Sequence, residues 1–273
     1  QPGRGTTQKC IMFGKNIVVK RNPDATYGSK LKVREIFDTI QGEGPFTGVP
    51  AVFIRLAGCN LRCHFCDTDF DSEVTEMSVE EILDEVYAVT TKDAHRRLIV
   101  ITGGEPFVQR ITKLCAALTQ GRNRYDVQIE TAGTLFEPGL TPMLTVGKVT
   151  LVCSPKTGAV HREIERHCRH WKYIVRMGEQ SESDGLPMLS TQDAGQALKI
   201  FRPAFSEFNT IWLQPCEEYI SKTVISEIDP NHIVQEQVPD VVRTKRNMDL
   251  AVSIAMKFDY RLSIQTHKIL GMR

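Results

Sequence analysis

The chain has 273 residues, with 34 Lys and Arg against 33 Asp and Glu, a formal net charge of +1 and 41% hydrophobic residues. This length suffices for a full hydrophobic core, and the composition is typical of a globular protein. A near-neutral charge provides no basic field that would recruit nucleic acid. No run of 18 apolar residues occurs, as a membrane-spanning helix would need. We therefore predict a cytoplasmic protein that binds neither nucleic acid nor membranes.

The first 30 residues differ from the rest of the chain. They carry six Lys or Arg against one Asp and show little periodicity. We interpret residues 1–30 as a flexible N-terminal extension and residues 31–273 as a single domain.

From residue 32 onward, short apolar runs alternate with segments of helical period. Strands are predicted at residues 32–37, 51–58, 98–102, 127–131, 149–153, 172–176, 210–214 and 262–266. Helices are predicted at residues 111–118, 192–201, 248–258 and after Ser78, which forms a capping box with Glu81. Strands separated by helices indicate parallel pairing with right-handed crossovers. The sequence thus predicts an α/β fold, an incomplete TIM-like barrel of parallel strands with outer helices.

Unusual polar sequences follow most of these strands. They are a cysteine-rich loop after residue 58, then "TGGEP", "ETAG", "SPKTG", "QPCEE" and "QTHK". Loops at the carboxyl ends of parallel strands converge on one face, where binding sites form. We expect a functional site there.

The first of these loops, "AGCNLRCHFCDTDF", places Cys59, Cys63 and Cys66 at C-x3-C-x2-C spacing. Thiolates at this spacing can bind zinc or an iron–sulfur cluster. Structural zinc takes four protein ligands, normally as two pairs, and the sequence offers no second pair; His64 is too close to turn back to the same metal. A zinc-stapled binding module without catalysis remains the alternative from another class. The other five cysteines are scattered, and we interpret most of them as small buried residues.

The cysteine spacing, with an aromatic residue before the last cysteine, resembles the radical S-adenosylmethionine (SAM) superfamily. The stretch "IQGEGPFTGVPAVFIRLAGCNLRCHFCDTDF", together with "ITGGEP", "IETAGT", "SPK", "QPC" and "QTHKILG", resembles the 7-carboxy-7-deazaguanine synthase family. The resemblance implies that Cys59, Cys63 and Cys66 ligate a [4Fe-4S] cluster, while SAM chelates the fourth iron. Reductive cleavage of SAM would then yield a 5′-deoxyadenosyl radical.

The same resemblance implies the reaction. The substrate would be 6-carboxy-5,6,7,8-tetrahydropterin, contracted to 7-carboxy-7-deazaguanine with loss of ammonia, which makes the enzyme a carbon–nitrogen lyase of queuosine biosynthesis. SAM would be regenerated and Mg²⁺ would assist. A flavodoxin or ferredoxin as electron donor and a homodimer are further expectations. The rival within the superfamily is an activase that places a glycyl radical on a protein.

The resemblance also implies site residues, none of which is assigned a catalytic side-chain role. For SAM they are Phe65, Cys66, Asp67, Gly104, Glu105, Glu130, Ser154, Pro155, Lys156, Gln214, Pro215, Cys216 and Glu217. For the substrate they are Ile40, Gln41, Gly42, Glu43, Arg55, Thr102 and His267, and for Mg²⁺ the ligand is Thr68.

Structural alternatives stay open for several of these residues. Gly103 and Gly104 could form an ordinary strand-to-helix turn. Glu130 could form an internal salt bridge, and Arg55, on a buried strand, could pair with Asp67 or Asp69. Phe65 could be a core aromatic, His267 a satisfied core histidine and "DTDFD" a hydrophilic turn.

Overall fold

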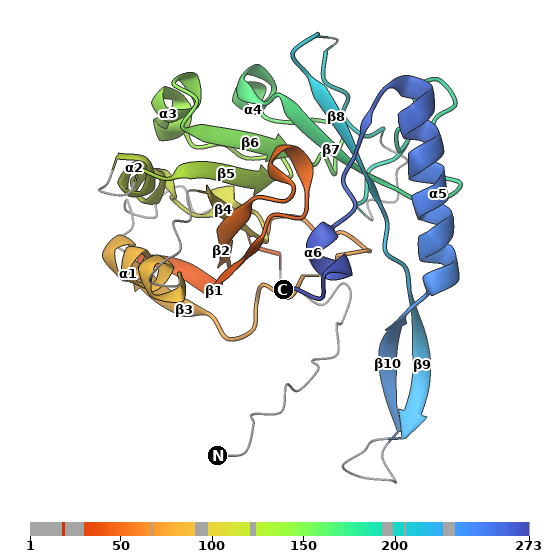
Figure 1. Cartoon of the computed structure of the whole chain (residues 1–273), viewed down its shortest axis with the longest axis horizontal. Coiled ribbons are helices and arrows are strands. Elements are labelled where there is room, and N and C mark those ends of the chain that lie inside the picture. The colour runs from red at the N-terminus through yellow and green to blue at the C-terminus, as the bar shows by residue number, and fades with distance from the viewer. Residues whose placement is uncertain are drawn as a thin grey trace.

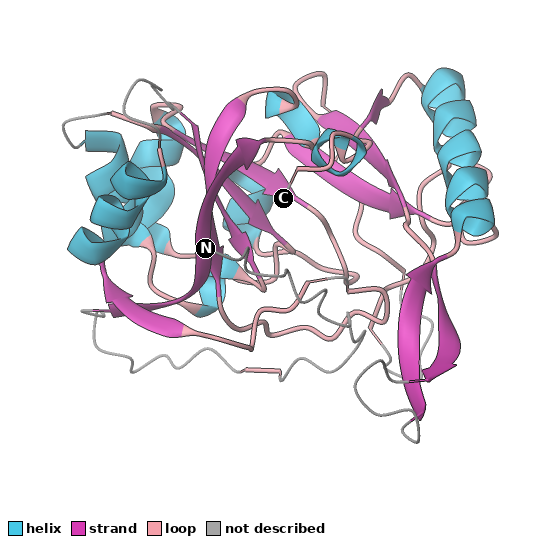
Figure 2. Ribbon diagram, turned by 60° about the horizontal axis from the view of Figure 1, so that its bottom comes forward, coloured by secondary structure: helices cyan, strands magenta, loops and turns pink. Residues whose placement is uncertain are grey.

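The structure is a computed structural model that describes residues 18–19, 30–66, 68–90, 98–120, 124–192, 199–204, 206–225 and 233–272. A nine-stranded sheet dominates it, in the order β11-β8-β7-β6-β5-β4-β2-β1-β3. A two-stranded sheet, β9 (Tyr219–Ile225) with β10 (Ile233–Pro239), projects from the body (Figures 1 and 2).

Seven strands of the large sheet are parallel and follow one another in chain order. They are β2 (Pro50–Leu56), β4 (Leu98–Gly103), β5 (Asp126–Thr131), β6 (Val149–Cys153), β7 (His170–Val175), β8 (Thr210–Pro215) and β11 (Arg261–Leu262). The central strand β4 begins with the apolar run Leu98–Ile101, which is buried, as expected for a strand with both faces covered. Sheet and helices together confirm the predicted α/β class.

Helices cover the outer face of the curved sheet (Figure 1). They are α1 (Val79–Val89), α2 (Thr112–Gln120), α3 (Thr141–Thr145), α4 (Arg162–His167) and α5 (Val241–Phe258), with the short α6 (Thr266–Ile269) near the C-terminus. Single 3-10 turns occupy Gly44–Phe46, Pro106–Val108 and Pro138–Leu140. The predicted capping box is present: Ser78 N donates to Glu81 Oε2 at 2.6 Å, and Glu81 N donates to Ser78 Oγ at 3.2 Å. Among the described helices, none has the length and apolarity to cross a bilayer.

The first strand departs from the parallel pattern. β1 (Lys30–Ile40) runs antiparallel to β2, and β3 (Thr75–Ser78) runs antiparallel to β1. The connection between β1 and β2, residues 41–49, is too short for a crossover, which takes a dozen residues or more.

The C-terminal half differs most from the prediction. Helix α5 begins at Val241, ahead of the predicted residue 248, because the Asp240 side chain accepts from Arg243 N and caps it. The strand predicted at residues 262–266 is reduced to β11, and its end becomes α6. Most of the helix predicted at residues 192–201 lies outside the described residues, while Lys199 forms an antiparallel bridge with Leu189.

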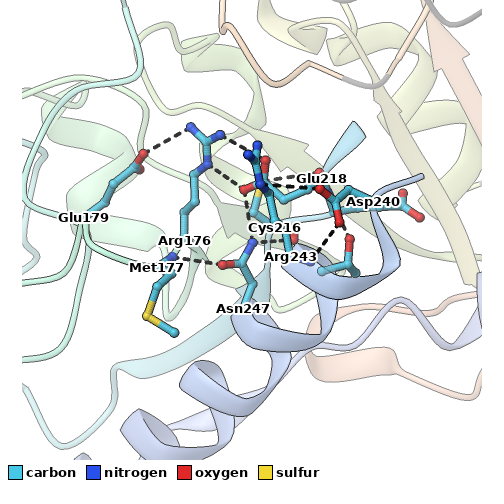
Figure 3. Close-up of polar contacts among 10 residues, drawn as sticks. Arg176, Met177, Glu179, Cys216, Glu218, Asp240, Arg243 and Asn247 are labelled. Carbon is cyan, nitrogen blue, oxygen red and sulfur yellow. Dashed lines mark hydrogen bonds and ion pairs between the residues drawn. The ribbon is translucent and has the colours of Figure 1, made fainter. Parts of the chain in front are cut away.

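Buried polar contacts fix α5 to the ends of β7 and β8 (Figure 3). Asn247 is 1% exposed; its Nδ2 donates to Cys216 O at 2.9 Å, and its Oδ1 accepts from Met177 N at 2.9 Å. Arg176 Nε donates to Glu218 Oε1 at 2.6 Å beside them. This network holds the outermost helix against the carboxyl ends of the strands.

Candidate active site

A pocket of about 500 Å³ opens at the carboxyl ends of the parallel strands. Its volume lies in the ordinary range of small-molecule sites. The predicted site residues that line it are Gln41, Glu43, Arg55, Cys59, Cys63, Phe65, Cys66, Thr68, Thr102, Gly104, Glu130, Ser154, Lys156, Gln214, Cys216, Glu217 and His267. Ile40, Gly42, Glu105, Pro155 and Pro215 do not line it, and Asp67 lies outside the described residues.

The three cysteines of the loop after β2 are half-buried free thiols that face this pocket. Leu61 N donates to Cys59 Sγ at 3.4 Å, and Cys66 N donates to Cys63 O at 3.2 Å. Burial raises the pKa of the Cys59 thiol to about 12, with a contribution from the nearby Glu105. By contrast Cys115, Cys153, Cys168 and Cys216 are buried, as predicted.

The thiols also bear on the zinc alternative. Within the described part of the chain, no three His, Cys, Asp or Glu side chains lie close enough together to hold a single metal ion. Structural zinc needs ligands that converge at about 2.3 Å on one point. The three thiols line one pocket, and a cluster with separate iron corners could use each of them as a ligand.

The side chains of Thr191 and Gln192 contact Cys63. Thr191 Oγ1 lies 3.2 Å and Gln192 Nε2 lies 3.3 Å from Cys63 Sγ, and Arg62 N donates to Gln192 Oε1 at 2.8 Å. Sequence reasoning missed both residues, because they follow the loop about 130 positions later and carry no motif.

The N-terminal region also reaches this loop. Val18 forms a parallel bridge with Cys59, and Val19 N donates to Cys59 O at 2.8 Å. Both residues belong to the predicted extension, whose boundary at residue 30 remains a prediction.

The paired glycines of "TGGEP" allow close backbone packing. A Cβ on Gly103, whose φ is +127°, would lie 2.1 Å from Leu56 O, and one on Gly104 would lie 2.1 Å from Gly58 O. Glycine is therefore required where the end of β4 supports the start of the cysteine loop. Gly104 also borders the pocket.

Glu105 is buried, and both oxygens of its carboxylate accept hydrogen bonds from neighbouring residues of the chain. Its Oε1 accepts from Thr131 Oγ1 at 2.8 Å and from Phe107 N at 3.2 Å, and its Oε2 accepts from Ala132 N at 2.7 Å. Burial raises the pKa of this carboxyl despite these donors. The carboxylate ties β4 to β5, and its contact with the SAM ammonium stays a prediction.

The "SPK" loop after β6 brings a cation to the pocket. Lys156 Nζ donates to Ser154 O at 2.9 Å and also to the Ser154 hydroxyl. Burial lowers the pKa of Lys156 below its ordinary value. The Lys156 carbonyl accepts from Thr191 N at 3.0 Å, which joins this loop to the residues that contact Cys63.

At the pocket, the "QPCEE" loop after β8 contacts α6. Glu217 Oε2 accepts from Lys268 Nζ and from Tyr219 OH, both at 2.6 Å. Gln214 and Cys216 line the pocket beside it. The C-terminal helix therefore closes this side through an ion pair that no sequence motif indicated.

Glu130 contacts residues expected on the substrate side. Its Oε2 accepts from Thr102 Oγ1 at 2.9 Å; its Oε1 accepts from Gln128 Nε2 at 3.0 Å and from Gln41 Nε2 at 3.2 Å. The internal salt bridge considered for Glu130 is not among the ion pairs of the described residues. The structure therefore joins Glu130 to Gln41 and Thr102.

Glu43 forms a buried ion pair with Lys172 on β7, and its Oε1 accepts from Gln265 Nε2 at 2.7 Å. Lys172 lines the same pocket. Sequence reasoning treated it as a strand residue; the available signal was a lysine inside the apolar run "HWKYIV".

Arg55 does not pair with Asp69 among the described contacts, and Asp67 lies outside the described residues. Its Nε lies 2.8 Å from Glu35 Oε1 on β1, and its guanidinium lies 5.8 Å from the centre of the Phe37 ring. Asp69 accepts instead from Ser72 and lies 4.0 Å from Arg34. Glu35, a residue that the sequence did not single out, is thus the internal partner of Arg55, and the contact of Arg55 with a substrate carboxylate stays a prediction.

The remaining predicted residues are placed by packing. A Cβ on Gly42 would lie 2.0 Å from His267 Nδ1, so α6 rests directly on the "IQGEG" loop. Phe65 is half-buried and makes an edge contact with His64, so it is not a core aromatic. Thr68 is half-buried at the pocket, and its carbonyl lies 3.7 Å from Cys66 Sγ.

Comparisons with known proteins agree with this geometry. Residues 53–176 match the radical SAM superfamily. The chain is 37% identical over 264 residues to the 7-carboxy-7-deazaguanine synthase of Rhodospirillum rubrum, covering 95% of this chain and 99% of that one. It is 36% identical over 265 residues to the enzyme of the same name from Rickettsia prowazekii, covering 96% of each.

The fold is similar to the crystal structure of QueE from Escherichia coli, with a TM-score of 0.57 and 23% identity, over 86% of this chain and 94% of that one. That likeness and the superfamily match confirm the predicted incomplete barrel. The chain belongs to the 7-carboxy-7-deazaguanine synthase family of the radical SAM superfamily.

Proposed function

We propose that this protein is a 7-carboxy-7-deazaguanine synthase that contracts 6-carboxy-5,6,7,8-tetrahydropterin with loss of ammonia, a carbon–nitrogen lyase of queuosine biosynthesis. The observation that carries the proposal is one pocket in which three thiols face Gln41, Glu43 and Arg55. A glycyl-radical activase needs no such set of small-molecule contacts in its pocket.

Cys59, Cys63 and Cys66 would hold a [4Fe-4S] cluster. When bound and reduced, the cluster and SAM supply the 5′-deoxyadenosyl radical that abstracts hydrogen from the substrate. Around SAM, Gly104 admits close backbone approach, and the Ser154 hydroxyl and Lys156 ammonium suit a ribose and a carboxylate. Because Lys156 is half-buried at the pocket, an anion bound to it would be partly shielded from bulk water.

On the substrate side, Arg55 and Thr68 would meet the carboxylate. Arg55 forms an ion pair with Glu35, its Nε lying 2.8 Å from Glu35 Oε1, and the terminal nitrogens of the guanidinium would donate to a second carboxylate. A Thr68 hydroxyl is an oxygen ligand of the type that Mg²⁺ accepts alongside substrate oxygens. Both groups would thus hold the same end of the substrate.

The opposite end of the substrate is a ring with adjacent N–H donors and a carbonyl. Gln41 offers both donor and acceptor, and Glu43 offers acceptors. Glu130, held by Thr102 and Gln41, presents a further carboxylate to the substrate. We therefore propose Glu130 as a substrate-side residue and no longer as part of the SAM contacts.

Further parts of the proposal rest on the family alone. They are a flavodoxin or ferredoxin as electron donor, a homodimer and location in the cytoplasm. Helix α5 leaves apolar side chains such as Val242 and Met256 exposed.

The test is anaerobic turnover of reconstituted protein with the pterin, SAM, Mg²⁺ and a strong reductant. Mass analysis should find 7-carboxy-7-deazaguanine in excess over the SAM consumed. If 5′-deoxyadenosine formed but the pterin stayed unchanged, the assignment to radical SAM chemistry would stand and the substrate assignment would be wrong. Full activity of Arg55→Ala on a protein substrate would favour the activase.

A further inference from the structure

A buried ion pair lies inside the pocket and is not explained by any motif. Lys172 Nζ donates to Glu43 Oε2, and both side chains are 11% exposed. Glu43 stands on the loop after β1 and Lys172 on β7, 129 residues apart. Both residues line the pocket, so the pair borders the space where the substrate would bind.

Burial of two charges is costly, and such pairs are often no more stabilising than apolar residues of the same size. The pair is therefore weak evidence of a contribution to stability. Its position in a pocket points instead to a need for charge at Glu43.

An ionised carboxylate only accepts hydrogen bonds, whereas a protonated one also donates. The 2-amino-4-oxo ring of a pterin presents a ring N–H next to an exocyclic amino group, which are two parallel donors. Only the ionised form of Glu43 can accept from both. Lys172 and Gln265 each occupy one lone pair of the carboxylate, and the carboxylate has further acceptor capacity.

The surroundings of Glu43 explain why a cation is needed. Burial acts to raise its pKa, but Lys172, the Gln265 hydrogen bond and the field of His267 outweigh it and lower the pKa below its ordinary value. Lys156, a half-buried residue of the "SPK" loop, also lies close enough to interact electrostatically with Lys172. Without Lys172, burial would be opposed by fewer groups, so the pKa of Glu43 would rise and a larger fraction of the carboxyl would be protonated.

We propose that Lys172 is a positioning residue that keeps Glu43 ionised and oriented, so that the pocket selects rings with an amidine-like pair of N–H donors. The inference rests on the proposed function, since it takes the pterin as substrate. It assigns to Lys172 no contact with the reacting carbon.

The test compares Lys172→Met with the wild-type enzyme over pH 6 to 9 in anaerobic steady-state turnover. Near neutral pH we expect KM for the pterin to rise about 10- to 100-fold, the effect of losing hydrogen bonds to a charged group, with kcat within a few-fold. Since Glu43 in the variant ionises only at higher pH, its KM should fall towards the wild-type value as pH rises. The wild-type KM should not show this recovery.

Three further variants make the outcome decisive. Lys172→Arg should have a KM close to that of the wild-type enzyme, because it keeps the positive charge. In a Glu43→Gln background, Lys172→Met should add little, because both changes act on the same contact. Lys148→Met, which removes an exposed lysine paired with Asp126, should behave as wild type.

A KM that stays unchanged in Lys172→Met, or that rises equally at every pH and adds fully to Glu43→Gln, would overturn the inference. If Lys172→Met does not fold by circular dichroism, the same pH series is measured on Lys172→Gln. An inactive but iron-loaded wild-type enzyme would instead refute the proposed function, so the two failures are distinct.

Discussion

Glu35 and Arg55 are cross-strand neighbours of β1 and β2, and their carboxylate and guanidinium meet at 2.8 Å at the edge of the pocket. The ion pair with Glu35 favours one position of the guanidinium before a second carboxylate arrives. The antiparallel register of the first two strands thus prepares the group proposed to bind the acidic end of the substrate.

Arg55→Met should raise KM for the carboxylated pterin about 10- to 100-fold, because a charge-assisted pair is lost. Glu35→Gln keeps the shape but removes the orienting charge, so a smaller rise, below about tenfold, is expected for a partly exposed pair. Steady-state turnover measures both. Arg162→Met, an exposed position, is the control. An unchanged KM in Arg55→Met would contradict the assignment of the carboxylate site.

Cys63→Ala should abolish cluster binding while the barrel remains folded, because Cys63 lies in a half-buried loop outside the core. Iron and acid-labile sulfide after anaerobic reconstitution, together with circular dichroism, measure both properties. Cys115→Ala, a core position, should retain iron. One zinc per chain without sulfide, or complete unfolding of Cys63→Ala, would favour a structural metal.

Gln192→Ala should shift the midpoint potential of the bound cluster to a more negative value. Hydrogen bonds to ligand sulfurs stabilise the reduced, more negative cluster, and Gln192 Nε2 lies 3.3 Å from Cys63 Sγ. A spectroscopic redox titration measures the shift. Gln237→Ala on the hairpin β9–β10 is the matched control, and equal potentials in the two variants would refute the role of Gln192.

Asn247→Ala should lower the free energy of unfolding by about 1–3 kcal/mol, because Cys216 O and Met177 N would each lose a partner. Urea denaturation measures the change. Asp249→Ala on the same helix, in an exposed pair with Lys245, should cost below about 0.5 kcal/mol. Similar losses in the two variants would show that the network of Figure 3 does not anchor α5.

Glu218 should make folding stability depend on pH. Burial acts to raise its pKa, but hydrogen bonds from Arg176 and Asn247 lower it below its ordinary value of 4.5. The folded state therefore favours the ionised form, and this stabilisation is complete above the unfolded pKa and lost as pH falls through the folded one. The difference in unfolding free energy between wild type and Glu218→Gln should shrink below about pH 4.5. A constant difference down to pH 3 would contradict this.

The sequence by itself determined the features that depend on neighbouring residues. The cysteine spacing indicated a cluster-binding loop, the Ser78–Glu81 capping box predicted a helix start, and apolar β-branched runs predicted the parallel strands. These signals are local, because the interacting groups lie within a few positions of one another. The polar motifs after the strands also predicted one shared face, since parallel strands end at the same edge.

Only the tertiary structure decided which side chains contact one another in the site. Glu35 rather than Asp69 meets Arg55, Lys172 meets Glu43 and Gln192 meets Cys63, and each pairing follows from strand register or loop packing. Packing also ended the predicted C-terminal strand at Leu262 and began α6 at Thr266, with His267 of this helix against Gly42. Side chains more than a hundred positions apart meet only when the whole sheet has formed, so no short pattern in the sequence records their contact.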